Sequence, residues 1–394
     1  MDQLERELTR RHFLKAAGVA TAAVGLGGIA AACTTGSSAS PSASSGGQAT
    51  AAPSVAGSPA ASFPMVAGQF NWMTWSDHWY QEQLDQIAKD YQIVPNITEL
   101  ADNADGFTKL KEVQGQLDMI SGDALWVPKY YEAGLIDAWD LNALPVSQQL
   151  FSVAREFKIW TTPEGYLGYP FGWSPVQIYY NPEYVKPAPD SWQVLIDPKY
   201  KKRVVVENQP TDNVAYMGKL NGVENPYDMT PEELAKAKES LILLKPNILK
   251  LSQQNTETVN ALASGEAWLS IGYLGMDDRV KEAGGPLVIP FIPKEGTVGW
   301  MDAEMIVKGG QNTPVVQPFL QVAEQAEYMA QNFLKYGRPL FNEQAYKLLV
   351  NQGQQERADR LLYNKPETVV NMALKGPGAS TQGAIDIWNE VFGA

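Results

Sequence analysis

Residues 292–306 read IPKEGTVGWMDAEMI, and this stretch organises the rest of the chain. It places an indole, Trp300, two residues before a carboxylate, Asp302, in an apolar context typical of a β-strand. Residues i and i+2 of a strand share one face, so both side chains are expected to point the same way. A flat π surface beside a negative charge suits an organic cation, for which a cation–π contact contributes roughly 0.5–2 kcal/mol. A core tryptophan followed by an aspartate in a turn is the alternative interpretation, which these residues alone favour.

The segments before this stretch alternate between strand and helix patterns. Residues 70–75 and 117–120 read as strands, and residues 84–91 and 123–134 read as helices. This alternation predicts an α/β layer architecture. Because 394 residues are too many for one compact core, we expect two lobes.

Two crossing segments are expected to join the lobes. Residues 169–175, which read YPFGWSP, predict the first passage, and residues 292–306 predict the return. The expected boundaries are 65–172 and 302–345 for lobe 1, and 173–301 and 346–394 for lobe 2.

Composition excludes several classes of site. A formal net charge of -13 argues against nucleic acid as a partner, because phosphate binding needs clustered basic residues. With one cysteine, Cys33, and two histidines, His12 and His78, the chain cannot form an intramolecular disulfide or a Cys/His zinc cluster. No nucleophile elbow, P-loop or dinucleotide fingerprint is present, so we expect neither an enzyme nor a cofactor nor a metal.

The N-terminus carries the pattern of an export signal. Arg10 and Arg11 precede an uncharged run of small and apolar residues, which predicts a twin-arginine signal peptide over residues 1–32. Cys33 follows three alanines and is predicted to be the lipid-bearing first residue of the mature chain. Ordinary cleavage after Ala32 is the alternative. Residues 33–64 are mostly Ser, Ala, Gly, Thr and Pro and predict an unstructured tether.

Several short segments together resemble one protein family. Their order and spacing are similar to those of the spermidine/putrescine-type extracellular solute-binding proteins of bacterial ABC transporters (family 1 solute-binding proteins), from about residue 68 to the C-terminus. The segments that carry the resemblance are NWMTWSD at 71–77, DMI at 118–120, EAGLI at 132–136, YPFGW at 169–173, SW at 191–192, DPKYK at 197–201, SGE at 264–266, PKEG at 293–296 and WMD at 300–302.

The resemblance implies a type II periplasmic-binding-protein fold whose two lobes close over a polyamine. It also implies delivery of the ligand to a membrane permease. Together with the predicted export signal and lipid at Cys33, this places a monomer in the periplasm or at the outer face of the cytoplasmic membrane, with the lipid as its one expected membrane contact. In that family aromatic rings stack on the ligand's methylene chain while carboxylates hold its ammonium groups. The predicted ligand-binding residues are Trp75, Ser76, Asp77, His78, Asp123, Trp173, Asp212, Tyr273, Trp300 and Asp302.

The chain departs from the family pattern inside the expected pocket. His78 stands where the family commonly has tyrosine, and Asp123 falls where it has serine. Two acidic positions of polyamine binders fall near Pro210 and Asn213, with Asp212 between them. The sequence therefore does not predict binding of a long triamine, whereas its acidic residues could form a site for a shorter or differently spaced cation.

Three alternatives remain open at this point. Two tyrosine pairs, at 130–131 and 179–180, resemble ferric ligands of iron-binding proteins with the same fold, since hard oxygen ligands suit a trivalent ion. The same fold also serves ligand sensors. Finally, paired carboxylates in a cleft are the equipment of glycoside hydrolases.

Overall fold

The computed structural model describes residues 63–393. The predicted signal peptide, Cys33 and nearly all of the predicted tether lie outside the described residues. Within the described range, no helix has both the length and the apolar character that a membrane crossing needs.

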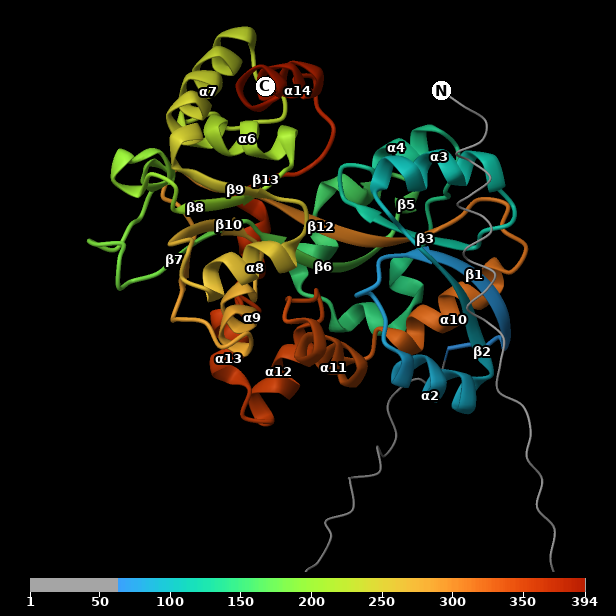
Figure 1. Ribbon diagram of the computed structural model, residues 1–394. Coiled ribbons are helices and arrows are strands. Elements are labelled where there is room, and N and C mark those ends of the chain that lie inside the picture. The colour runs from blue at the N-terminus through green and yellow to red at the C-terminus, as the bar shows by residue number, and fades with distance from the viewer. Residues whose placement is uncertain (1–62, 394) are drawn as a thin grey trace, which may run out of the picture. The chain divides into compact units, whose positions relative to one another are not determined.

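The first sheet has six strands in the order β13-β12-β3-β1-β2, with β6 pairing to β12 (Figure 1). β1 runs parallel to β2 and β3, whereas β12 runs antiparallel to β3 and β6. The strand that contains Pro95 lies at the sheet edge, as its missing N–H donor requires. The strand bounds are β1 Gly68–Thr74, β2 Ile93–Glu99, β3 Met119–Asp123, β6 Tyr169–Pro175, β12 Thr297–Ile306 and β13 Met372–Leu374.

The second sheet has five strands in the order β11-β7-β10-β8-β9. Strand β8 begins with three valines because both of its faces are buried. Val204 and Val206 pack into one core cluster, and Val205 packs into another on the opposite face of the sheet. The bounds are β7 Gln177–Tyr180, β8 Val204–Glu207, β9 Ile248–Ser252, β10 Leu269–Gly272 and β11 Ile289–Phe291, with a separate hairpin of β4 Thr161–Thr162 and β5 Gly165–Tyr166.

Helices cover both sheets (Figure 1). α6, α7 and α14 lie over one face of the second sheet, and α8 and α9 lie over the other. The cap predicted at Thr230 forms, with reciprocal hydrogen bonds to Glu233 at the start of α7. The bounds are α2 Gln81–Tyr91, α3 Asn103–Val113, α4 Val127–Glu132, α5 Ser152–Glu156, α6 Pro210–Leu220, α7 Pro231–Leu244, α8 Asn255–Ala263, α9 Met276–Glu282, α10 Thr313–Ala323, α11 Ala326–Tyr336, α12 Glu343–Asn351, α13 Gln355–Arg360 and α14 Thr381–Phe392.

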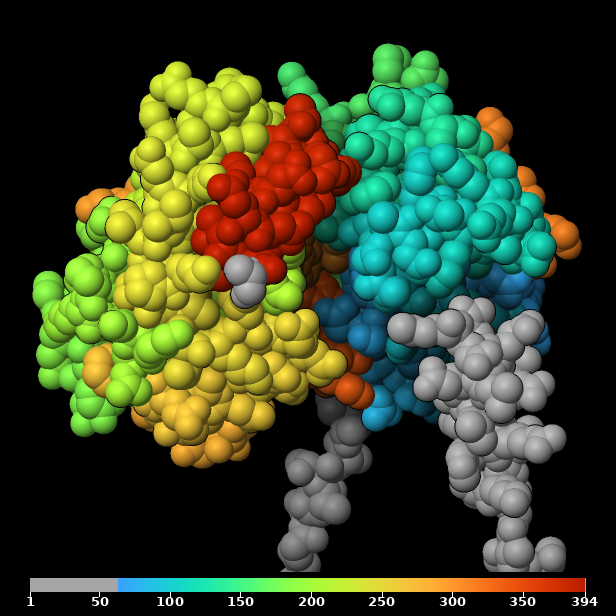
Figure 2. Space-filling model, turned by 45° about the horizontal axis from the view of Figure 1, so that its top comes forward, coloured from blue at the N-terminus to red at the C-terminus, as the bar shows by residue number. Residues whose placement is uncertain are grey.

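β12 belongs to both lobes. Val298, near its start, packs into the second core, whereas Met301 and Met305 pack into the first. A hollow between the surfaces of the two lobes is visible in the space-filling view (Figure 2). β12 therefore connects the two cores beside the place where a ligand between the lobes would lie.

The C-terminal segment divides between the lobes differently from our expectation. We placed residues 346–394 in lobe 2, but Ala358, Leu361 and Tyr363 pack into the core of the first sheet. α14 joins the second core, through residues such as Trp388, and Ala373 of β13 packs against that core as well. The amphipathic pattern of residues 346–394 fits either core equally well, so the pattern alone does not show which core each helix joins.

Trp173 is a core residue and does not line the hollow between the lobes, contrary to our expectation. Its side chain is fully buried, with its ring centroid 4.7 Å from that of Phe341 and within 6.5 Å of those of Phe151 and Tyr363. All seven residues of β6 are buried, so this strand is covered on both faces. Trp300, in contrast, is half-buried and contributes to none of the core clusters of the described residues.

Replacing Trp173 with alanine should lower the free energy of unfolding by about 3–5 kcal/mol, the usual cost of removing a large core aromatic. Trp300→Ala is the matched control and should cost about 1 kcal/mol, because that ring is only half-buried. Urea denaturation followed by far-UV circular dichroism measures both. Equal losses for the two variants would contradict the different places assigned to these indoles.

Candidate functional site

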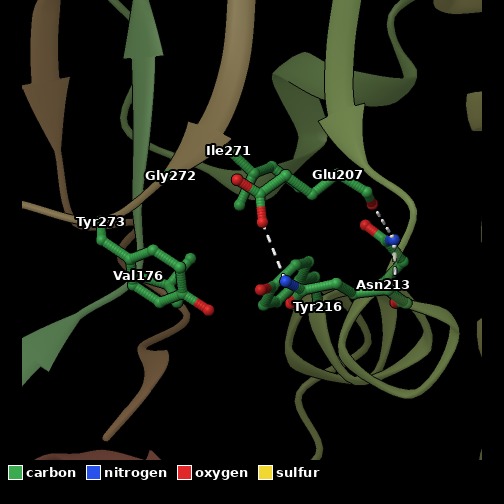
Figure 3. Close-up of a pocket in the computed structure, with 8 residues that line it drawn as sticks. Val176, Glu207, Asn213, Tyr216, Ile271, Gly272 and Tyr273 are labelled. Carbon is green, nitrogen blue, oxygen red and sulfur yellow. Dashed lines mark hydrogen bonds between the residues drawn. The ribbon is translucent and has the colours of Figure 1, made fainter. Parts of the chain in front are cut away.

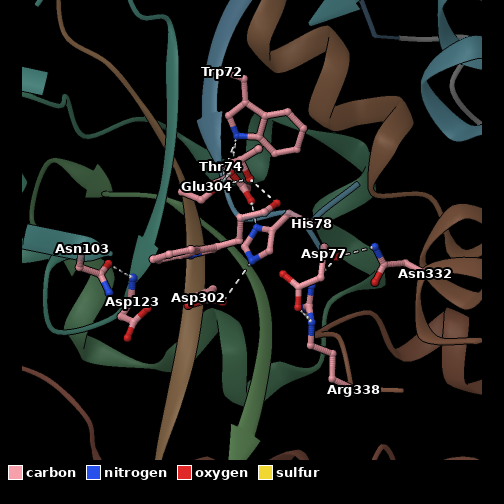
Figure 4. Close-up of polar contacts among 12 residues, drawn as sticks. Trp72, Thr74, Asp77, His78, Asn103, Asp123, Asp302, Glu304, Asn332 and Arg338 are labelled. Atoms are coloured by element: carbon pink, nitrogen blue, oxygen red, sulfur yellow. Dashed lines mark hydrogen bonds and ion pairs between the residues drawn. The ribbon is translucent and has the colours of Figure 1, made fainter. Parts of the chain in front are cut away.

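A buried histidine lies at the centre of the polar residues of the first lobe. His78 follows β1, and its ring is held between two carboxylates of β12: Nε2 lies 3.1 Å from Oδ2 of Asp302, and Nδ1 lies 2.5 Å from Oε1 of Glu304 (Figure 4). Asp302 and Glu304 are two positions apart and so share one face of the strand. The ring also stacks on Phe171, with centroids 4.0 Å apart.

Burial and two neighbouring carboxylates act in opposite directions on the pKa of His78. Burial disfavours the imidazolium, but Glu304 and Asp302 stabilise it and together raise the pKa of His78 to about 9. Both ring nitrogens then donate hydrogen bonds. Glu304 is further held by Ser121 Oγ at 2.7 Å and by Trp72 Nε1 at 3.1 Å, both of which donate to its Oε2.

Asp77 is paired with an arginine from the segment after α11. Nε of Arg338 donates to Oδ2 of Asp77 at 2.8 Å (Figure 4). Burial acts to raise the pKa of Asp77, but the Arg338 guanidinium and His78 outweigh it and hold that pKa below its usual value. The same guanidinium lies 5.8 Å from the ring centroid of Trp300. The indole predicted to face an organic cation thus already has one cation of the chain beside it.

Asp123 and Asp302 form a second acidic pair. They are directly opposite each other in the antiparallel register of β3 and β12, which places their side chains on one face of the sheet. Burial, followed by the charge of Asp302, raises the pKa of Asp123 well above its usual value. With both carboxyls ionised, the buried Oδ1 of Asp302 has no hydrogen-bond donor among residues 63–393. A proton on Asp123, which its raised pKa favours, would be shared with Asp302 until a ligand cation takes its place.

In the second lobe, Asp212 is bound by side chains of the chain itself. It lies in the first turn of α6, where its Oδ2 is 2.6 Å from Nζ of Lys375 and its Oδ1 accepts from the Tyr227 hydroxyl at 2.8 Å. Lys375 also donates to the hydroxyl of Tyr273. Burial acts to lower the pKa of Lys375, but Tyr273 and Asp212 outweigh it and raise that pKa.

A small cavity of about 10 Å³ lies at the carboxyl ends of β8 and β10, with Tyr273 across from Asn213 (Figure 3). It has room for about one water molecule. Glu207 lines it and accepts from Gln209 Nε2 at 2.8 Å, and burial raises the pKa of Glu207. Asn213, which falls near a family acid, donates instead to the carbonyls of Glu207 and Gln209.

The structure brings together His78, Asp123 and Asp302 directly, and Asp77 and Trp300 through Arg338. Ser76 is exposed, and its carbonyl accepts from Tyr336. Trp75 is half-buried against the first core. Our sequence reading missed four charged residues of the site: Glu207, Glu304, Arg338 and Lys375. Glu207 ends a valine-rich strand, and Glu304 follows Asp302 by two residues in the same strand. Both could therefore have been predicted from their positions in strands. No local pattern marks the other two.

The tyrosine pairs do not converge on one point. Tyr130 packs in the first core, whereas Tyr179 and Tyr180 pack in different clusters on opposite faces of the second sheet. The Tyr179 hydroxyl donates to the carbonyl of Tyr273 at 2.6 Å. This placement gives the ferric interpretation no common set of ligands.

Comparison with known proteins identifies the family. Residues 82–355 match the family described as bacterial extracellular solute-binding protein. This chain belongs to that family. Residues 7–27 match the twin-arginine translocation signal, which together with the family indicates export.

Relatives of this solute-binding protein include two curated proteins. The putrescine-binding periplasmic protein SpuD of Pseudomonas aeruginosa is 25% identical over 302 residues, which cover 72% of this chain and 80% of SpuD. The spermidine/putrescine-binding periplasmic protein 1 of Haemophilus influenzae is 24% identical over 286 residues, covering 70% and 76%.

Among solved structures, the spermidine/putrescine ABC transporter substrate-binding protein PotD of Streptococcus pneumoniae superposes with a TM-score of 0.71 at 18% identity. The match covers 82% of this chain and 98% of PotD. At that identity the similarity shows the fold. The two-lobed periplasmic-binding-protein fold predicted from the sequence is therefore confirmed.

The raised pKa of His78 predicts a pH-dependent stability. An unfolded histidine titrates near 6.5, so the contribution of the folded imidazolium is fully present below about pH 6.5 and is lost as pH rises through about 9. The free energy of unfolding should fall by a few kcal/mol over that window, on the order expected for a shift of this kind. Urea denaturation of wild type and His78→Gln at pH 6.5 to 10 measures it. Parallel pH profiles for the two proteins would show that the folded ring is neutral.

Proposed function

We propose that this protein is the binding component of an ABC importer for small organic amines and that it acts without catalysis. The observation that carries the proposal is the buried oxygen Oδ1 of Asp302 beside Asp123, because an acid pair of this kind is completed by an ammonium group. The amine would lie between the lobes and be handed to a permease. Putrescine and spermidine, for which the curated relatives are named, are the first candidates.

Capture of a ligand between the lobes follows from the placement of the acid pair on β3 and on the crossing strand β12. β3 and β12 position Asp123 and Asp302 in the first lobe, while β12 also packs into the second core. A ligand that contacts both lobes has a higher affinity for the closed arrangement, and this difference drives closure.

We also propose that Cys33 is lipidated and holds the domain at the outer face of the cytoplasmic membrane. The support is its position after three alanines at the end of the signal and before the Ser- and Ala-rich tether. The small domain would then stay near the permease while remaining soluble itself.

Replacing Asp123 with asparagine should weaken amine binding by about ten- to a hundredfold. The variant keeps the shape of the side chain but removes a charge-assisted hydrogen bond, which contributes about 1.5–3 kcal/mol. Titration calorimetry with putrescine, spermidine and simple alkylamines measures the change. Asp190→Asn is the matched control, because Asp190 is exposed and pairs with Lys294 on the surface. Equal affinity in all three proteins would remove Asp123 from the site.

Replacing Cys33 with serine should release the exported protein from the membrane fraction. A single thioether-linked anchor is the only membrane contact that this proposal assigns, so its loss leaves a soluble domain. Cell fractionation with metabolic labelling by a radioactive fatty acid measures both location and lipid. Exchange of Arg10 and Arg11 for lysine is the companion variant and should instead block export. A Cys33→Ser protein that stays with the membrane would contradict lipid anchoring.

A further inference from the structure

The acids of the site differ in whether the chain already neutralises them. Asp77 is paired with Arg338, Glu304 is paired with His78, and Asp212 is paired with Lys375. Asp302 shares His78 through one oxygen only, and its other oxygen lacks a donor among the described residues. Asp123 and Glu207 have no ion-pair partner among the described residues, and Glu207 accepts from the neutral Gln209 instead. The Asp123–Asp302 pair is the place where two carboxyls meet at a buried oxygen without a donor, so an added positive charge is best accommodated there.

Lys375 is fixed in place by the backbone as well as by its charge. It directly follows β13, and its N–H donates to the carbonyl of Gly299 in β12 at 2.8 Å. Its ammonium reaches the second lobe, where it lies 2.6 Å from Asp212 and 4.9 Å from the ring centroid of Tyr273. The ammonium of Lys375 thus makes a cation–π contact with Tyr273 and an ion pair with Asp212, which are the contacts that the ammonium of an amine ligand would make.

The charge of Asp212 is already paired with an ammonium of the chain itself. One of its oxygens is taken by Lys375 and the other by the hydroxyl of Tyr227. The side chains of Lys375 and Asp212 are only 15% and 10% exposed, so displacing the lysine would leave its charge buried without a partner. The backbone hydrogen bond of Lys375 is to Gly299, three residues before Asp302 in β12, so the lysine lies beside the strand that carries part of the first-lobe pair. Consistent with this placement, its charge acts to lower the pKa of Asp123.

We propose that Lys375 supplies the second ammonium of this binding site from within the chain, so that the protein selects amines with one charged nitrogen over diamines of the same length. The inference rests on the proposed recognition of an amine by Asp123 and Asp302. A monoamine completes that pair, whereas the second ammonium of a diamine meets the like charge of Lys375 and finds Asp212 occupied. This narrows the proposed ligand from the polyamines for which the relatives are named to a primary alkylamine with an uncharged tail.

The test compares amines that differ only in the second nitrogen. Propylamine, butylamine and pentylamine are titrated by calorimetry against the diamines of three, four and five carbons, putrescine being the four-carbon one. The proteins are the exported form of the wild type, Lys375→Met and the double variant Lys375→Met/Asp212→Asn. Lys308→Met is the matched control, because Lys308 is exposed and pairs with Asp137 on the surface.

Wild type and Lys308→Met should bind at least one monoamine tenfold or more tightly than the diamine of the same length. Lys375→Met frees Asp212, so this preference should shift by at least tenfold toward the diamine, and the double variant should lose that shift. A wild type that binds the diamines more tightly than the monoamines of the same length would overturn the inference while leaving amine recognition intact. A wild-type preference for monoamines that Lys375→Met leaves unchanged would overturn the role of Lys375. Absence of binding by every monoamine and diamine in the wild type would overturn the proposed function itself. The wild-type comparison decides the question even if the Lys375 variants fail to fold.

Discussion

The bonds of His78 to Asp302 and Glu304 are the interaction on which the first-lobe site depends. Two carboxylates on one face of β12 repel each other when buried, and a single imidazolium between them removes most of that cost. The same ring fixes the chain after β1 against β12, and it stacks on Phe171 of β6. Three strands that are distant in sequence thereby meet at one charged group. The remaining oxygen of Asp302 keeps its orientation because Oδ2 is held.

Internal neutralisation of acids gives this site a different character from an open acidic cleft. A net charge of -13 alone would favour binding of any cation. However, Arg338, His78 and Lys375 each pair with an acid that would otherwise be available to the ammonium groups of a ligand. Removing one partner of a buried ion pair is strongly destabilising, because it leaves the other charge buried without compensation. Under the proposed function, the site recognises charge at a defined point, and general electrostatic attraction contributes mainly to the rate of encounter.

The sequence predicted the fold better than it predicted the site, for a physical reason. Period-2 patterns and cap chemistry are local, so β1, the edge position of Pro95 and the cap at Thr230 followed from neighbouring residues. The partners of the site are not local: Asp77 and Arg338 are 261 positions apart, and Tyr273 and Lys375 are 102 apart. Trp173 was misplaced because a strand covered on both faces shows no alternation that separates core from cleft.

In the proposed function, the location of the acid pair separates recognition of the ligand from closure of the lobes. Asp123 and Asp302 both belong to the first sheet, so their contacts with an ammonium are the same whether the lobes are apart or together. A ligand shifts a conformational equilibrium only through contacts that differ between its two states. Closure must therefore be driven by second-lobe groups around the rest of the ligand, and Tyr273, Tyr216 and Glu207 line the cavity there. Charge at the first lobe then selects the head of the ligand, while the fit of its tail at the second lobe determines how strongly binding favours the closed form.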